Sequence, residues 1–294
     1  MTTPATPNSD RAPIGATPGS GGAGSWLVAC DLDQTLIYSR RSFRLDPALA
    51  EPDLTLVERL DGSPVTYMTR SGVDLLGRLA AVVPVVPVTT RTYAQYRRVD
   101  LGLRPRYAVT TNGGQLLVDG VPDGDWATTV QDRLAATSRP LDEILTIAER
   151  LGAQDWVRLV RVADDLFIYL VAYERDGIPD LEAVARDLAA AGWTLSVQGR
   201  KVYLVPATLT KRSALAEVAR RLGTSRIAAA GDSLLDRPML ADADLAVRPS
   251  HGELHELGWT ASNLRVVPAV GLAAGVAILT LLADAVGVAP TVAV

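Results

Sequence analysis

The 294-residue sequence predicts an α/β protein whose core is a parallel β-sheet covered by helices on both faces. Short, continuous apolar runs at 25–30, 82–88 and 107–111 are typical of strands that are buried on both sides. Helical patterns alternate with these runs, as they do in βαβ units. Polar residues follow the runs at once, Asp31 after the first and Thr89 after the second. Open α/β sheets place their ligands at this edge.

The first third of the chain contains three of the six predicted core strands. Thr69 is a typical N-cap for the helix that follows it. Residues 39–68 contain prolines and an Asp-Gly pair, so we expect them to be irregular. Asn112-Gly113-Gly114 has the composition of a turn. The elements expected here are strands at 25–30, 82–88 and 107–111 and helices at 70–81 and 93–101.

The middle of the chain has a different order of elements. Helices precede pairs of strands, and Gln198-Gly199-Arg200 suits a tight hairpin. This order predicts an α/β module with an antiparallel sheet. Its expected elements are helices at 141–151 and 181–191 and strands at 156–162, 166–173, 194–197 and 201–205.

After Pro206, helical patterns again alternate with short apolar strands, as in the first third of the chain. The final apolar stretch, 271–286, is expected to be a buried helix rather than a membrane span. Pro268, Asp284 and Pro290 leave it shorter than the roughly 20 apolar residues that a span needs. The expected elements are helices at 211–222 and 271–286 and strands at 227–230, 245–247 and 264–267.

These patterns divide the chain into three parts. Residues 1–24 are mostly Thr, Pro, Ala, Gly and Ser, which predicts a disordered tail without a signal peptide. Residues 25–114 and 207–290 form a Rossmann-like three-layer core around the parallel sheet. Residues 115–206 form an inserted α/β cap domain.

Composition excludes some classes of protein. The formal net charge is −4 and there is no basic footprint, so we expect no nucleic-acid partner and no membrane partner. Cys30 is the only cysteine, which favours a reducing compartment and a cytoplasmic location. The sequence does not predict the number of subunits.

Four short polar segments are predicted to meet at the carboxyl edge of the sheet, where acidic residues are hard to explain as sheet stabilisers. They are Asp31-Leu32-Asp33-Gln34-Thr35, Thr89-Thr90-Arg91, the start of the helix at Lys211, and Gly231-Asp232 with Asp236.

These residue types suit phosphoryl transfer, which needs a nucleophile, a proton donor and cations around the transferred group. Asp31 can attack phosphorus and form an aspartyl-phosphate. Asp33 can protonate the leaving group and later activate water. Mg²⁺ prefers carboxylate and water oxygens. The predicted metal group is Asp31, Asp33, Asp232 and Asp236, in which Asp31 and Asp232 supply ligands and Asp236 orients bound water.

The other candidates would bind a small phosphorylated substrate. The Thr89 hydroxyl and the Lys211 ammonium can bind phosphoryl oxygens, and Lys is a compact charge suited to this. Lys211 and Lys201 are the only lysines in a chain rich in arginine. Thr90, Arg91 and Asn112 are further substrate-binding candidates.

The pattern resembles the haloacid-dehalogenase-like (HAD) phosphatase superfamily. Its four motifs are matched in order by Asp31-x-Asp33-x-Thr35, by the strand that ends in Thr89, by Lys211, and by Gly231-Asp232 with Asp236. The insertion lies between the second and third motifs, as in a capped subgroup that includes sucrose-phosphate and mannosyl-phosphoglycerate phosphatases. The resemblance implies a Mg²⁺-dependent phosphatase acting on a small phosphomonoester, with a sugar phosphate as the expected substrate.

Three positions depart from the subgroup. Leu235 stands where Asn is usual, Thr90 where Gly is usual after the motif's Thr, and Gln34 where Gly is common. Two other functions stay open. A phosphomutase would use the same Asp31 and Asp33, and the sequence does not exclude it. A catalytically weakened regulatory or binding protein is suggested by Leu235.

One further pattern is a pair of histidines, His251 and His255, with two glutamates nearby. Four-residue spacing suits zinc on one helix face, but no third ligand is evident. We expect a solvated face here.

Overall fold

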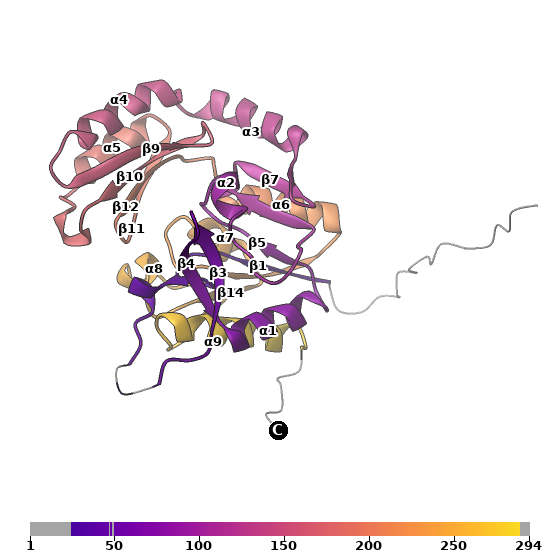
Figure 1. Ribbon diagram of the computed structural model, residues 1–294. Coiled ribbons are helices and arrows are strands. Elements are labelled where there is room, and N and C mark those ends of the chain that lie inside the picture. The colour runs from indigo at the N-terminus through magenta and orange to yellow at the C-terminus, as the bar shows by residue number, and fades with distance from the viewer. Residues whose placement is uncertain (1–24, 47, 49, 289–294) are drawn as a thin grey trace, which may run out of the picture.

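The computed structural model describes residues 25–288 except 47 and 49, so the predicted tail and residues 289–290 lie outside the described residues. A five-stranded sheet forms the centre, and each of its neighbouring pairs is parallel. This confirms the predicted fold class (Figure 1). The strands lie in the order β15 (Leu264–Val266), β14 (Leu245–Arg248), β13 (Arg226–Ala230), β1 (Trp26–Cys30) and β5 (Val85–Pro87).

Strand β1 shows why its sequence is continuously apolar. Leu27 and Ala29 belong to the core on one face of the sheet, and Val28 and Cys30 to the core on the other. Successive side chains of a strand point to opposite faces, so a strand covered on both sides has no polar position. The covering helices are α1 (Arg70–Ala80) and α9 (Leu272–Ala285) on one face, and α6 (Lys211–Leu222) and α7 (Arg237–Asp242) on the other.

The strand order reverses at β1. The chain leaves β1 for β5 on one side and later returns to β13 on the other. Such a switch point opens a crevice outside the carboxyl ends of the strands, where ligands bind in open α/β sheets. Asp31 directly follows β1 and therefore lies in this crevice.

The stretch 39–68 is irregular only in part, so the prediction is wrong for its second half, 54–68. It contains two long strands, β3 (Leu54–Leu60) and β4 (Ser63–Thr69), and β4 also pairs with β2 (Tyr38–Ser39). Asp61 and Gly62 link β3 to β4 with φ values of 48° and 79°. Positive φ at both positions is the geometry of a two-residue hairpin turn, which Asp-Gly favours.

A second Asp-Gly turn lies just beyond the predicted boundary of the insertion. Strand β7 (Gln115–Val118) runs antiparallel to β6 (Tyr107–Thr110) and turns through Asp119-Gly120 into β8 (Val121–Pro122). A single bridge between Val88 and Val109 joins this hairpin to the core. Residues 115–122 thus pair with β6, and the boundary of the insertion at 114/115 stays a prediction.

Two helices differ from expectation. Helix α2 (Tyr93–Tyr96) is shorter than the predicted 93–101, because the chain then pairs with β3: the Asp100 N–H donates to the Val57 carbonyl at 2.7 Å. Helix α3 (Gly124–Thr137) was not predicted. It buries only Trp126 and Val130, which gives too few apolar positions for a helical pattern.

The cap has the predicted antiparallel sheet. Helices α4 (Leu141–Gly152) and α5 (Glu182–Ala190) pack on one face of this sheet. The other face is turned toward the core (Figure 1). The strands lie in the order β11 (Trp193–Gln198), β12 (Lys201–Pro206), β10 (Phe167–Ala172) and β9 (Val157–Ala163).

Helix α6 begins at the predicted residue because Thr210 caps its N-terminus. The Thr210 side chain accepts a hydrogen bond from the Ser213 N–H, and Gly223 ends the helix with φ 64°. Lys211 is therefore the first helical residue. The apolar helix α9 lies against α1. Within 25–288, no helix combines the length and the apolarity that crossing a membrane demands.

Candidate active site

Three buried aspartates meet at the carboxyl end of β1. Asp31 follows β1, and Asp232 and Asp236 come from the loop between β13 and α7. Each offers a carboxylate oxygen, and these oxygens all lie within 4.8 Å of one another. Three like charges this close repel one another strongly, so the cluster requires cations.

Lys211 supplies one positive charge from the start of α6. Its ammonium donates to Asp31 Oδ1 at 2.6 Å and to Asp236 Oδ1 at 2.5 Å. Burial lowers the pKa of Lys211, but the two carboxylates outweigh this effect and raise the pKa above its usual value. Lys211 is therefore a permanent cation at the base of the crevice.

Asp236 is held from its other side by the loop that carries Asp232. Its Oδ2 accepts hydrogen bonds from the Ser233 N–H at 3.0 Å, the Ser233 hydroxyl at 2.7 Å and the Asp232 N–H at 3.2 Å. A Cβ on Gly231 would lie only 2.4 Å from Asp236 Cγ, so only glycine fits there. Close packing against Asp236 thus explains why glycine stands in the Gly-Asp pair of the fourth motif.

The charge balance of the cluster fits a divalent cation. Burial raises the pKa of Asp31 to about 7 although Lys211 lowers it, and burial with the neighbouring Asp31 raises the pKa of Asp232. One ammonium cannot neutralise three carboxylates. Asp31 and Asp232 keep oxygens for a metal, whereas both oxygens of Asp236 already accept hydrogen bonds. Hard oxygen donors of this kind suit Mg²⁺.

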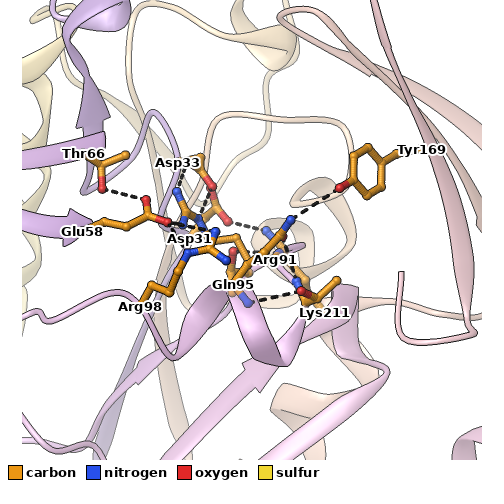
Figure 2. A network of polar contacts seen from close by, with 11 residues as sticks. Asp31, Asp33, Glu58, Thr66, Arg91, Gln95, Arg98, Tyr169 and Lys211 are labelled. Atoms are coloured by element: carbon orange, nitrogen blue, oxygen red, sulfur yellow. Dashed lines mark hydrogen bonds and ion pairs between the residues drawn. The ribbon is translucent and has the colours of Figure 1, made fainter. Parts of the chain in front are cut away.

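Asp33 lies beside the cluster and has a different partner. Arg91 Nε and Nη2 donate to the two Asp33 oxygens at 2.7 and 2.8 Å (Figure 2). Burial raises the pKa of Asp33, but Arg91 outweighs it and lowers the pKa to about 2. The Asp33 side chain is 44% exposed, so a substrate can reach it. Within the described part of the chain, Asp33 is not among the clustered carboxylates, and a metal role for it stays a prediction.

A buried glutamate, Glu58, holds Arg91 in place. Arg91 Nη1 lies 2.8 Å from Glu58 Oε1, which also accepts from Arg98, and the Thr66 hydroxyl donates to Glu58 Oε2 at 3.1 Å (Figure 2). Glu58 lies on β3, in the stretch expected to be irregular, so sequence analysis missed it. The Asp61-Gly62 turn was the available signal for this hairpin.

The remaining predicted substrate-binding residues fall into two groups. Thr90 lines the cavity above the aspartates. Thr89 is fully buried, and its hydroxyl accepts from the Arg91 N–H at 3.1 Å. Asn112 is also buried, and its amide donates to the Leu209 carbonyl at 2.7 Å. Asn112 therefore supports the loop before Lys211, and the structure does not place it at the cavity.

A cavity of about 410 Å³ lies between the core and the cap. Its floor includes Asp31, Asp33 and Asp232. The cap side is formed by β10, β12 and the tip of the hairpin between β11 and β12. The cap residues that line it are Val171, Gln198, Gly199, Arg200, Lys201 and Tyr203. A volume of this size accommodates a small ligand.

Two acidic residues missed by sequence analysis tie the cap to the core. Glu253 accepts from the Leu234 N–H of the Asp232 loop at 2.8 Å and from the Ser196 hydroxyl of β11 at 2.9 Å. Asp164, in the turn between β9 and β10, accepts from the Thr111 hydroxyl at 2.5 Å and from the Tyr93 N–H at 3.0 Å. Each link joins a cap strand or turn to a loop of the site.

His251 does not lie on a solvated face, so that expectation is wrong. It is 1% exposed. Its Nδ1 accepts from the Gly271 N–H at 3.1 Å, and its Nε2 therefore donates to the Gln34 carbonyl at 2.9 Å. Gln34 has φ 60°, which explains why glycine is favoured at this position. His251 thus holds the turn that follows Asp33.

This histidine makes stability depend on pH. Burial lowers the pKa of His251 to about 4. The unfolded chain, with an ordinary histidine pKa, binds a proton first as pH falls. The contribution of His251 to stability is therefore full above about pH 6.5 and falls by up to about 3 kcal/mol toward pH 4.

The measurement is urea unfolding of the wild type and of His251→Gln between pH 4 and 7.5. The wild type should exceed the variant in unfolding free energy at pH 7.5, and the difference should shrink toward pH 4.5. A difference that stays constant over this range would contradict the prediction.

Comparisons with known proteins agree with this fold. No family model matches the chain, and no curated protein matches its sequence. Among solved structures, the sucrose-phosphatase of Synechocystis sp. PCC6803, in complex with sucrose and phosphate, is similar with a TM-score of 0.61 and 16% identity, over 89% of this chain and 98% of that one. A subclass IIB sugar phosphatase of the HAD superfamily has a TM-score of 0.55 and 12% identity, over 89% of this chain and 100% of that one.

A third structure, a phosphatase of the same superfamily from Bacteroides thetaiotaomicron, has a TM-score of 0.52 and 14% identity, over 94% of this chain and 100% of that one. The chain therefore has the fold of the HAD phosphatases, with a core and a cap.

Proposed function

We propose that this chain is a Mg²⁺-dependent phosphatase that hydrolyses a small phosphomonoester, a sugar phosphate, through an aspartyl-phosphate on Asp31. The observation that carries the proposal is the cluster at the end of β1, where Asp31 lies 2.6 Å from the Lys211 ammonium and shares a cation-demanding site with Asp232 and Asp236. Similarity to sugar phosphatases of the same fold supports the choice of substrate class.

The reaction follows from the placement of these side chains. An Asp31 oxygen attacks phosphorus, and the bond from phosphorus to the leaving oxygen breaks. Lys211 holds Asp31 and offers its remaining donor capacity to the phosphoryl oxygens. Asp31 and Asp232 would hold Mg²⁺, which when bound neutralises charge on the transferred group. Water then attacks phosphorus, and the bond between phosphorus and the Asp31 oxygen breaks, which returns the carboxylate and releases phosphate.

Asp33 moves the protons in both halves of the reaction. It gives a proton to the leaving oxygen in the first half and takes one from water in the second. Its pair with Arg91 favours the ionised state, which suits the second half. Protonation for the first half requires that substrate binding weakens this pair, because a carboxylate held at a pKa of about 2 is not an acid at neutral pH.

The departures from the motif pattern do not weaken the proposal. Leu235 is buried in the apolar core. The Ser233 hydroxyl provides polar support to Asp236 instead. The catalytically weakened alternative rested on Leu235, so this arrangement favours an active enzyme. The single cysteine, Cys30, is buried, and we place the enzyme in the reducing cytoplasm.

The test is phosphate release from a panel of sugar and nucleotide phosphates, with Mg²⁺ and with chelator. We expect chelation to lower the rate by about 100-fold or more, and added Mg²⁺ to restore it, because the carboxylate cluster lacks its balancing charge without metal. Ca²⁺ is a control that keeps the charge but relaxes the geometry, and it should support a lower rate. Equal release with chelator would contradict the metal's role, and isomerisation of a hexose phosphate without release of phosphate would indicate the phosphomutase.

A further inference from the structure

The rim of the cavity above the aspartates is basic. Arg41 approaches from the core side, on the short helix between β2 and β3, and Arg200 and Lys201 approach from the hairpin tip of the cap. All three line the same cavity. Ser42 and Gln198 lie among them and add neutral hydrogen-bonding groups.

None of these three cations forms an ion pair with the residues that the structure describes, although Lys201 is near enough to Asp33 to help lower the pKa of that carboxyl. The ion pairs there involve other arginines and Lys211. Arg200 donates to the backbone carbonyl of Tyr173 at 3.0 Å, which uses one of its five N–H groups. The Lys201 ammonium lies 5.9 and 6.0 Å from the ring centres of Tyr169 and Tyr203, which hold it without neutralising it.

The floor of the cavity does not account for this charge. Lys211 together with a bound Mg²⁺ would balance the three clustered aspartates. Asp33 and Glu58 are balanced by Arg91 and Arg98. The rim cations therefore form a local excess of positive charge, and excess charge of one sign at a cleft attracts a ligand of the opposite sign.

We propose that the substrate carries a second anionic group, a carboxylate or a second phosphate, which Arg41, Arg200 and Lys201 bind at the rim while the phosphoryl group lies on Asp31. This inference rests on the proposed phosphatase function. The cavity is large enough for both ends of such a molecule. Charge-assisted hydrogen bonds from arginine are the strong, selective kind.

The test compares substrate pairs that differ in the second anion. Glucose 6-phosphate with 6-phosphogluconate tests a carboxylate, and fructose 6-phosphate with fructose 1,6-bisphosphate tests a phosphate. We expect kcat/KM to be about tenfold or more higher for the doubly anionic member of at least one pair, mainly through KM. The pair that shows the preference identifies the anion.

Substitutions of the rim residues test whether they cause the preference for the doubly anionic substrate. Arg200→Gln, Lys201→Gln and Arg41→Gln should each reduce the preference ratio by about fivefold. Arg161→Gln is the matched control, because Arg161 is exposed on the neighbouring cap strand β9 and lies outside the cavity. The preference ratio compares two substrates on the same protein, so a general loss of active protein leaves it unchanged. No preference in either pair, or a preference that survives all three rim substitutions, would overturn the proposal.

A binding measurement distinguishes failure of this inference from failure of the proposed function. The same compounds are titrated into Asp31→Asn protein by calorimetry, in buffer that contains Mg²⁺. If the wild type releases no phosphate but the doubly anionic compounds bind about tenfold tighter, the phosphatase proposal fails and the anion site stands. If each pair binds equally, or none of the compounds binds, the anion site fails.

Discussion

Asp31→Asn is expected to lower phosphate release by on the order of 10⁴-fold or more, which is the scale of losing a nucleophile that acts as part of a unit. The amide keeps the shape of the carboxylate but cannot attack phosphorus. It also removes one ligand of the proposed metal site. The measurement is kcat on the best substrate of the panel, with folding checked by circular dichroism.

A covalent intermediate provides a sharper test of the same residue. With an aryl phosphate, whose leaving group needs little help from a proton donor, Asp33→Asn should still form the aspartyl-phosphate but hydrolyse it slowly. Acid-quenched Asp33→Asn protein should therefore carry phosphate that hydroxylamine removes, as expected of an acyl phosphate. The double variant with Asp31→Asn should carry none.

The matched control for Asp31 is Asp74→Asn. Asp74 lies exposed on α1, away from the cavity, so activity should stay within about twofold of the wild type, as is usual for surface substitutions. If Asp31→Asn retained more than a tenth of the activity, or if the double variant carried bound phosphate after acid quenching, Asp31 would not be the nucleophile.

The sequence predicted the buried core well, and the reason is physical. Strand β1 and helices α1 and α6 have patterns set by burial and by caps within a few residues, such as Thr69 and Thr210. The carboxyl ends of parallel strands must meet at one edge, so Asp31 and Asp232 could be placed together before any coordinates. Lys211 joined them because its helix begins at that edge.

The elements that sequence analysis missed depend on contacts between residues that are distant in the sequence. The β3–β4 hairpin places Glu58 against Arg91, and this pairing of residues that are distant in sequence leaves no periodic signal. Asp61-Gly62 and Asp119-Gly120 are pairs that favour hairpin turns, but neither hairpin was predicted, because the prolines of 39–68 favoured an irregular segment. His251 and Glu253 looked solvated because their burial comes from contacts with Gln34 and the cap.

The division of the site's charges could be predicted only in part. Residue types identified the candidate acids and cations, but not which pairs they form. Arg91 appeared as a substrate ligand, and the structure pairs it with Asp33 and Glu58 instead. Asn112 was a substrate-binding candidate, yet its side-chain amide donates to the Leu209 carbonyl. Side-chain partners depend on tertiary contacts that a single sequence does not specify.

Lys211→Met is the second substitution expected to have a large effect, and it should act on stability and activity together. It leaves Asp31 and Asp236 buried without their ammonium, and removing one partner of a buried ion pair typically costs about 3–5 kcal/mol. Phosphate release should fall by about 100-fold or more, because the pKa of Asp31 rises further and less of it is ionised.

The physical argument predicts a dependence on Mg²⁺ that a packing defect would not show. A divalent cation on Asp31 and Asp232 replaces part of the missing charge, so Lys211→Met should bind Mg²⁺ more tightly than the wild type does. Mg²⁺ should therefore raise the unfolding free energy of Lys211→Met more than that of the wild type. Urea unfolding with Mg²⁺ and with chelator measures both values. Lys211→Arg should not restore activity, because a planar guanidinium does not fit the place of a compact ammonium that is 1% exposed.

Lys201→Met is the matched control, since Lys201 is the only other lysine and forms no ion pair with the residues that the structure describes. Its substitution should change the unfolding free energy by about 1 kcal/mol or less. If Lys211→Met were as stable as Lys201→Met with chelator present, the two carboxylates would not need the ammonium, and the charge argument for a cation at this site would fail. If Lys211→Met were destabilised equally with and without Mg²⁺, the metal would bind elsewhere than on Asp31 and Asp232.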